Sequence, residues 1–121
     1  MPILEIDLVV QPGEVLLTDL AARLADAAAA IFKSPPRGTW VKLRTLDPVQ
    51  YAENDGPSSL DVFPVFVSVV KAKSDARSRT SEARRLAESF ARICGRPTEN
   101  VHITYEPRAL GRVAFGGRLL K

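Results

Sequence analysis

Hydrophobic and polar residues alternate over residues 3–10, and this period of two is typical of a β-strand with one buried face. Residues 11–13, Gln-Pro-Gly, are strong turn formers and end the predicted strand. Over residues 17–31 the apolar positions recur at spacings of three and four, which predicts an amphipathic helix that stops at the Ser-Pro-Pro of residues 34–36. A second strand is predicted over residues 39–46. The first part of the chain therefore predicts a strand, a helix and a strand.

The second part of the chain predicts the same order of elements. Residues 62–70 form a run that is apolar on both alternating faces, so a strand there needs cover on both sides. A helix is predicted over residues 80–94, because its apolar residues form one stripe and Gly95 and Pro97 follow as stop signals. The last strand is predicted over residues 101–105.

The two halves also match residue by residue when 62 is added to the number of each position. The matches include Pro2 with Pro64, Thr18 with Thr80, Arg23 with Arg85, Leu24 with Leu86, Ile31 with Ile93 and Pro35 with Pro97. Two copies of a long unit favour a pseudo-symmetric duplication over a solenoid, which needs at least three copies. We therefore expect a single domain over residues 1–121. It comprises pseudo-repeats 2–47 and 62–106, a linker 48–61 and a C-terminal tail 107–121.

Right-handed crossovers would place both helices on one face of a four-stranded mixed sheet, which is an α+β fold made of tandem βαβ units. The other face of that sheet would have no cover from its own chain. Since the predicted strand over residues 62–70 is apolar on that side too, we expect the chain to associate with copies of itself, most simply as a closed ring. The tail after Pro107 is expected to add a turn or a short strand to a neighbour.

Composition narrows the class of protein. The chain has 121 residues, a formal charge of +3, one Cys and one His, so neither a disulfide framework nor a Cys/His metal site is expected. Many of the basic residues lie between Lys71 and Arg85, without the aromatic interleaving or recognised motif of a nucleic-acid interface. No segment reads as a signal peptide or membrane span, so a cytoplasmic protein is the default. Cys94 is interpreted as a small core residue.

Pro2 is the candidate for chemistry. Removal of Met1 would leave it as a free secondary amine at the start of an ordered strand. An α-amino group titrates near about pH 7.7–8.0, and burial or nearby cations lower this pKa, so a neutral and basic nitrogen at pH 7 is expected. The alternative is that Pro2 only begins the strand, where its missing N–H costs little.

The chain resembles the tautomerase superfamily, which includes 4-oxalocrotonate tautomerase, malonate semialdehyde decarboxylase and macrophage migration inhibitory factor. The resemblance spans the whole chain and rests on Met1-Pro2 before a strand, the duplicated βαβ unit, residues 100–106 (Asn-Val-His-Ile-Thr-Tyr-Glu) and residues 111–117 (Gly-Arg-Val-Ala-Phe-Gly-Gly). It implies a homotrimer with sites at subunit boundaries. It also implies proton transfer by Pro2 on a small-molecule substrate, with no metal and no organic cofactor.

The same resemblance supplies candidate substrate-binding residues. Lys73 and Arg77 follow the predicted strand over residues 62–70, where related enzymes place cations that hold a carboxylate and stabilise an enolate. His102 takes the position of a substrate-binding arginine in 4-oxalocrotonate tautomerase. Trp40 and Phe115 are expected to form apolar walls beside the proline. The structural alternatives are solvated cations, a structural histidine and ordinary core aromatics.

The predicted function is that of a tautomerase or isomerase that uses the N-terminal proline as general base on a small enol or 2-oxo acid. Decarboxylation or hydratase chemistry on a three-carbon acid stays open. The carboxylate that hydration needs has only Glu53 and Glu106 as candidates. A non-catalytic binding trimer also stays open, and retention of Met1 would favour it, because Pro2 would then be an amide nitrogen.

Overall fold

The computed structural model describes residues 2–56 and 62–121, so Met1 and part of the predicted linker lie outside the described residues. The main elements are β1 (Ile3–Val9), α1 (Leu20–Phe32), β2 (Trp40–Leu46), β3 (Val65–Val70), α2 (Ala76–Cys94) and β4 (Val101–Tyr105). Short 3-10 helices span Pro48–Gln50 and Thr98–Asn100, and the tail forms β5 (Ala114–Phe115) and β6 (Arg118–Leu119). Several predicted bounds differ from the structure. α1 begins at Leu20 rather than residue 17, α2 at Ala76 rather than residue 80, and β3 at Val65 rather than residue 62.

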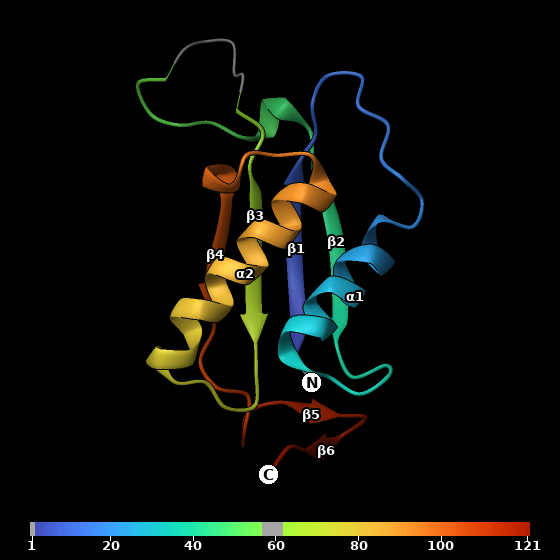
Figure 1. Ribbon diagram of the computed structural model, residues 1–121, viewed down its shortest axis with the longest axis vertical. Helices are drawn as coiled ribbons and strands as arrows, with labels where there is room; N and C mark the ends of the chain where they lie inside the picture. Colours follow the sequence, from blue (N-terminus) through green and yellow to red (C-terminus); the bar gives the residue numbers. More distant parts are fainter. Residues whose placement is uncertain (1, 57–61) are drawn as a thin grey trace.

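The four long strands form one mixed sheet in the order β2-β1-β3-β4. β1 is parallel to β2, β3 is parallel to β4, and the two pairs join through the antiparallel contact of β1 with β3. Both helices cover the same face of the sheet (Figure 1). The predicted α+β fold of two βαβ units is therefore confirmed.

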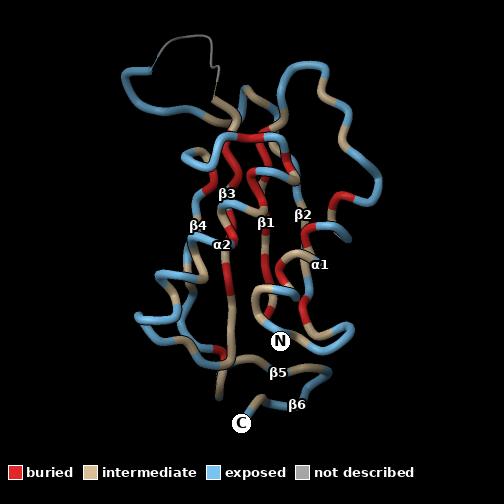
Figure 2. Tube along the Cα trace, viewed as in Figure 1, coloured by how far each residue is buried: buried red, intermediate tan, exposed pale blue. Residues whose placement is uncertain are grey.

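The core lies between the helices and this covered face. Alternate residues of β1 and β3 point into it, and the buried segments of these strands run along the middle of the sheet (Figure 2). The residues that make up the core include Leu4, Ile6, Leu8, Leu20, Leu24, Val65, Val67, Val69, Leu86 and Phe90. Burial raises the pKa of the Cys94 thiol to about 11, in keeping with its predicted place in the core. No helix among the described residues is long and apolar enough to cross a membrane.

The opposite face of the sheet is open in the single chain and is more polar than the sequence predicted. Lys42 binds Glu5 at 2.8 Å, and Arg44 binds Asp7 at 3.0 Å. The apolar pattern of β3 is broken on this face by Ser68, which leaves Phe66 as its large hydrophobic residue there, 36% exposed. The open face therefore combines ion pairs with the aromatic rings of Trp40, Phe66 and His102.

The tail forms a hairpin with its own chain. Its first part runs beside the segment after β3, where the Ala109 amide donates to the Lys71 carbonyl at 2.7 Å. β5 then pairs with β6 in antiparallel register. This hairpin lies next to the N-terminal end of β1 (Figure 1). The tail thus forms two short strands of its own within the described chain, and its contact with a neighbouring copy stays a prediction.

Candidate active site

Pro2 is buried at one end of the sheet, where β1 and β2 begin and β3 and β4 end. Its carbonyl accepts a hydrogen bond of 3.0 Å from the Trp40 amide, which fixes Pro2 to β2. The register of β1 with β3 pairs Ile3 with Val70, so its continuation by one residue sets Pro2 opposite Lys71. Pro2 therefore belongs to an ordered strand end.

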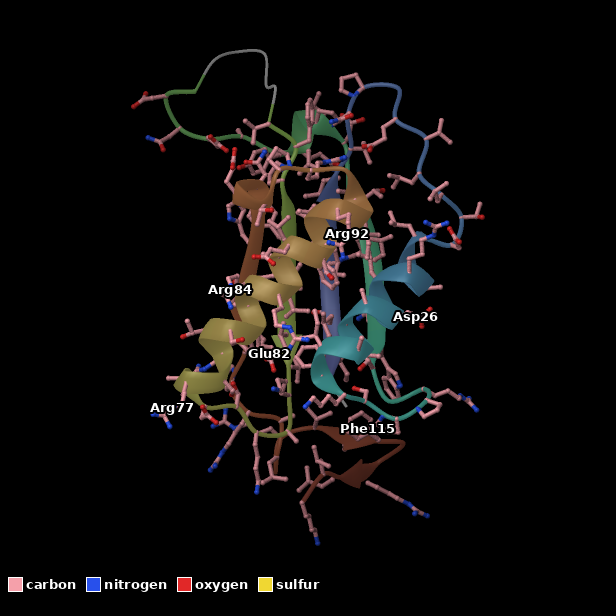
Figure 3. All side chains as sticks on the ribbon, in the orientation of Figure 1. Asp26, Arg77, Glu82, Arg84, Arg92 and Phe115 are labelled. Atoms are coloured by element: carbon pink, nitrogen blue, oxygen red, sulfur yellow. The ribbon has the colours of Figure 1, made fainter. Side chains whose placement is uncertain are left out.

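Two predicted aromatic residues meet beside Pro2. The Trp40 and Phe115 rings lie 5.4 Å apart in an edge-to-face arrangement, and Trp40 Nε1 donates to the Arg37 carbonyl at 2.9 Å. Phe115 reaches this position because the tail hairpin folds back under the sheet (Figure 3). An edge-to-face pair of this kind is a favourable aromatic contact. The two rings form one apolar wall, although Trp40 stays 50% exposed in the single chain.

Lys73 and Arg77 are exposed, in the loop before α2 and in the first turn of α2. Figure 3 shows Arg77 pointing outward from this turn, well apart from Phe115. The structure therefore brings Pro2, Trp40 and Phe115 together and leaves Arg77 outside the group.

Lys71 belongs to a charged cluster on the covered side of the sheet. Its Nζ donates to Glu82 Oε2 at 2.9 Å and lies 5.1 Å from the centre of the Phe32 ring. The Tyr105 hydroxyl donates to Glu82 Oε1 at 2.8 Å. The side chains of Lys71 and Glu82 are only 20% and 12% exposed. Burial, and then the contact with Glu82, raises the pKa of Tyr105, so this phenol stays protonated.

The sequence carried a signal for this cluster. Glu82 lies one and two helical turns before Leu86 and Phe90, both of which are fully buried. A carboxylate on a buried stripe needs a partner, because an unpaired buried charge is very costly. The sequence pattern showed Lys71 only as one of several basic residues and Tyr105 only as the end of a predicted strand, so it did not indicate that they meet at Glu82.

Two further polar atoms at this end are buried without a hydrogen-bond partner among the described residues, namely Ser74 Oγ and Arg79 Nε. The Arg79 guanidinium carbon lies 6.0 Å from the centre of the Tyr105 ring. Since buried polar atoms are nearly always bonded, water or a polar ligand would satisfy them. Residues 2–56 and 62–121 contain no cluster of three or more His, Cys, Asp or Glu residues suited to a metal ion.

His102 lies elsewhere. It is on the open face, where its ring is 5.4 Å from that of Phe66, and Phe66 precedes Val70 by four residues. At about 3.3 Å per residue, His102 is roughly 13 Å along the sheet from the Pro2 end. Within one chain it does not join Pro2.

Of the two acidic candidates, Glu53 lies away from Pro2, whereas Glu106 follows the end of β4 at the Pro2 end of the sheet, on the open face. Tyr51 packs on Phe66 at 5.8 Å and donates to Glu53 at 2.6 Å, so Glu53 lies toward His102. Glu106 accepts a hydrogen bond from Ser68 and lines a groove of about 160 Å³ on the open face.

Comparison with solved structures gives the class of fold. No protein-family model matches the sequence, and a search of curated proteins finds no significant match. The structure is similar to that of a fused 4-OT, described as a symmetric trimer, with a TM-score of 0.76 and 12% identity over 97% of this chain and 94% of the other. It is also similar to the FG41 malonate semialdehyde decarboxylase inhibited by 3-bromopropiolate, with a TM-score of 0.69 and 21% identity over 94% of this chain and 88% of the other.

A third similar structure is macrophage migration inhibitory factor from Oncomelania hupensis. Its TM-score is 0.71 and its identity 19%, over 98% of this chain and 81% of the other. These proteins are members of the tautomerase superfamily, and the chain has the fold that they share. The resemblance drawn from the sequence is thus confirmed at the level of the fold.

Proposed function

We propose that Pro2, freed as a secondary amine by removal of Met1, is the general base of a tautomerase or isomerase that acts on a small enol or 2-oxo acid. The observation that carries the proposal is the burial of Pro2 on an ordered strand beside the Trp40 and Phe115 pair. A free α-amino group in such surroundings is expected to be neutral near pH 7, since burial disfavours its charged form.

The proton transfer needs only this nitrogen and a cation. The neutral amine accepts the proton of the enol hydroxyl, the electron pair of the enolate moves to the neighbouring carbon, and the ammonium returns the proton to that carbon. A cation beside the oxygen stabilises the charge that develops there. Lys73, exposed in the loop after β3, is our candidate for this cation, since the Lys71 ammonium is already paired with Glu82. The aromatic wall would exclude water.

We propose further that the working unit is a homotrimer. One supporting observation is the open sheet face. Another is that solved structures of similar fold are described as trimers. Because His102 lies at the other end of the sheet from Pro2, a substrate-binding role for it requires a neighbouring copy of the chain.

A decarboxylase acting on a three-carbon acid is the second candidate. It is favoured by the likeness to two solved malonate semialdehyde decarboxylases, at 21% and 17% identity. Release of carbon dioxide from such an acid would distinguish it from simple tautomerisation. A non-catalytic binding trimer would instead retain Met1 or show no dependence on Pro2.

The test begins with the intact mass, which establishes whether Met1 is removed. Ketonisation of phenylenolpyruvate is then measured for the wild type, Pro2→Ala and the control Pro12→Ala, whose proline is exposed in the loop after β1. We expect kcat/KM to fall by about 100-fold or more in Pro2→Ala, the usual range for loss of a general base, and to change less than about twofold in Pro12→Ala. Retained Met1, or equal activity in the two variants, rules out the amine as the base.

A further inference from the structure

A groove of about 440 Å³ lies between α1 and α2, on the side of the helices away from the sheet. The two helices pack against each other over the same face of the sheet, and the groove follows the line where they meet (Figure 1). One wall is apolar and the other is charged. The lining includes Ala27, Ala30 and Ile31 from α1 and Arg85, Glu88 and Arg92 from α2.

The two arginines of this groove have no acidic partner in the chain. Arg85 and Arg92 are two helical turns apart, which is about 10 Å along α2. Glu88 lies three residues from Arg85 and four from Arg92, and this spacing permits ion pairs on a helix. Among the described residues, no ion pair joins Glu88 to either arginine, and Arg92 donates only to Ser89 Oγ, at 3.4 Å. Both guanidinium groups are therefore available to an external carboxylate.

The outer side of α2 as a whole is basic. Its exposed arginines are Arg77, Arg84, Arg85 and Arg92, and Glu88 is its one exposed carboxylate. This excess of three positive charges equals the formal charge of the whole chain. Guanidinium groups are weakly hydrated and bind carboxylates in a bidentate manner, so they suit contacts with an acidic protein surface.

The α1 wall determines the shape of the partner. Ala27 and Ala30 present only a methyl group each, and Ile31 adds an apolar side chain next to them. Packed helices lie about 8–10 Å apart, with the distance set by the side chains at the contact, so small residues permit a close approach. A third helix can therefore lie along the groove with its apolar side chains on this wall.

A protein helix fits these features better than a nucleic acid does. Phosphate groups would pair with the two arginines, but a sugar-phosphate backbone offers no apolar group to cover Ala30 and Ile31. Proteins that bind single strands stack bases on aromatic side chains, and the only aromatic residue of α2, Phe90, is fully buried.

We propose that the groove between α1 and α2 is a docking site for an acidic amphipathic helix of a partner protein. The helix places its apolar side chains on the α1 wall and its carboxylates on Arg85 and Arg92. Because α1 and α2 cover the face of the sheet opposite the open face, the groove remains accessible in a trimer formed through the open face (Figure 1). The inference depends neither on Pro2 nor on the removal of Met1.

The test is a titration with a stapled, fluorescein-labelled helical peptide, followed by fluorescence anisotropy. The peptide carries leucines along one side and glutamates beside them, and a matched peptide carries lysines in place of the glutamates. We expect the glutamate peptide to bind, and the lysine peptide to bind at least about tenfold more weakly, because like charges meet across the contact.

Arg85→Ala/Arg92→Ala is expected to weaken binding of the glutamate peptide by about tenfold or more, since arginines often carry much of the energy of an interface. The matched control is Arg77→Ala/Arg84→Ala, which removes the same charge from the same helix. These two arginines lie on the side of α2 away from α1 (Figure 3), so we expect less than about a threefold change. Equal losses in the two double variants, or no binding at low salt, overturn the proposal.

Ala30→Gln tests the apolar wall, because it fills the groove without changing its charge. We expect it to weaken binding of the peptide by about tenfold, since a polar amide would be buried under the helix. A short DNA duplex that binds through Arg85 and Arg92, together with a peptide affinity that Ala30→Gln leaves unchanged, would replace the helix by a nucleic acid. A wild-type mass in light scattering that falls in Arg85→Ala/Arg92→Ala would instead make the occupant a second copy of this chain.

Discussion

Arg96 is the most heavily bonded side chain in the described chain, and it joins parts that are distant in sequence. Its guanidinium donates to the Val9, Phe63 and Cys94 carbonyls and to both oxygens of Glu14, at 2.7–2.9 Å. All five N–H donors of an arginine are used in this way. With its side chain 2% exposed, Arg96 fixes the loop after β1 to the end of α2.

We expect Arg96→Met to lower the free energy of unfolding by about 3–5 kcal/mol, because it leaves the Glu14 carboxylate and three carbonyls without their donor. Urea denaturation followed by circular dichroism measures this loss. The matched control is Arg92→Met, since Arg92 is exposed on the same helix, and its expected effect is within about 0.5 kcal/mol. Equal effects of the two changes would mean that the Arg96 contacts add no net stability.

The pH dependence of the free energy of unfolding provides a second test of the contact between Arg96 and Glu14. The hydrogen bonds from Arg96 hold the pKa of Glu14 below its usual value of 4.5. A carboxyl whose folded pKa is depressed stabilises the protein fully above its unfolded pKa and loses that contribution as the pH falls through the folded pKa. The stability difference between the wild type and Arg96→Met is therefore expected to narrow between about pH 7 and pH 3. A constant difference would contradict the charge pairing.

At this scale the sequence predicts some contacts and misses others for a physical reason. Pro2, Trp40 and Phe115 were proposed as site residues from a resemblance. Trp40 contacts both of the others, through its ring and its amide, and the role of the three residues stays a prediction. The pairing of Lys71 with Glu82 was not predicted, because a contact between a strand end and a helix depends on tertiary register rather than on local sequence pattern. The placement of Glu82 on a buried stripe was the one local sign of it.

At the scale of elements, α2 shows how helix ends are specified. Its first turn, from Ala76, carries no apolar stripe, and the helix starts there because the Asp75 side chain accepts from the Ser78 amide at 2.9 Å. Its end is Gly95, with a φ of 68°. The apolar pattern predicted the end correctly and placed the start one turn too late.

Gly95→Ala is expected to cost about 1 kcal/mol of unfolding free energy, because an L-residue at a positive φ of 68° is strained. A Cβ there meets no atom within 4 Å, so the cost comes from the backbone rather than from a clash. Gly95→Asn is the control, since asparagine tolerates this conformation and is expected to lose less. Thermal melts of both variants measure the difference. An equal loss in both would show that conformational strain is not the cause.

At the scale of the whole molecule, the order of the strands follows from two βαβ units and the handedness of their crossovers, so the sequence predicts it. The character of the open face does not follow in the same way. The run of residues 62–70 reads as apolar, but its first residues precede β3, and Lys42 and Arg44 pair with Glu5 and Asp7 across the sheet. Which residues share a face depends on where each strand begins, and this is set by tertiary pairing.

The proposed trimer is tested on this open face. We expect the mass from light scattering to equal three chains of 13.2 kDa. Phe66→Glu is expected to shift it toward one chain, because a buried, unpaired carboxylate is costly at an interface. Val15→Glu is the matched control, since Val15 is 92% exposed in the loop after β1 and is expected to keep the trimer. A wild-type protein with the mass of a single chain would refute the proposed trimer. A Phe66→Glu variant that remains a trimer would place the interface elsewhere than the open face.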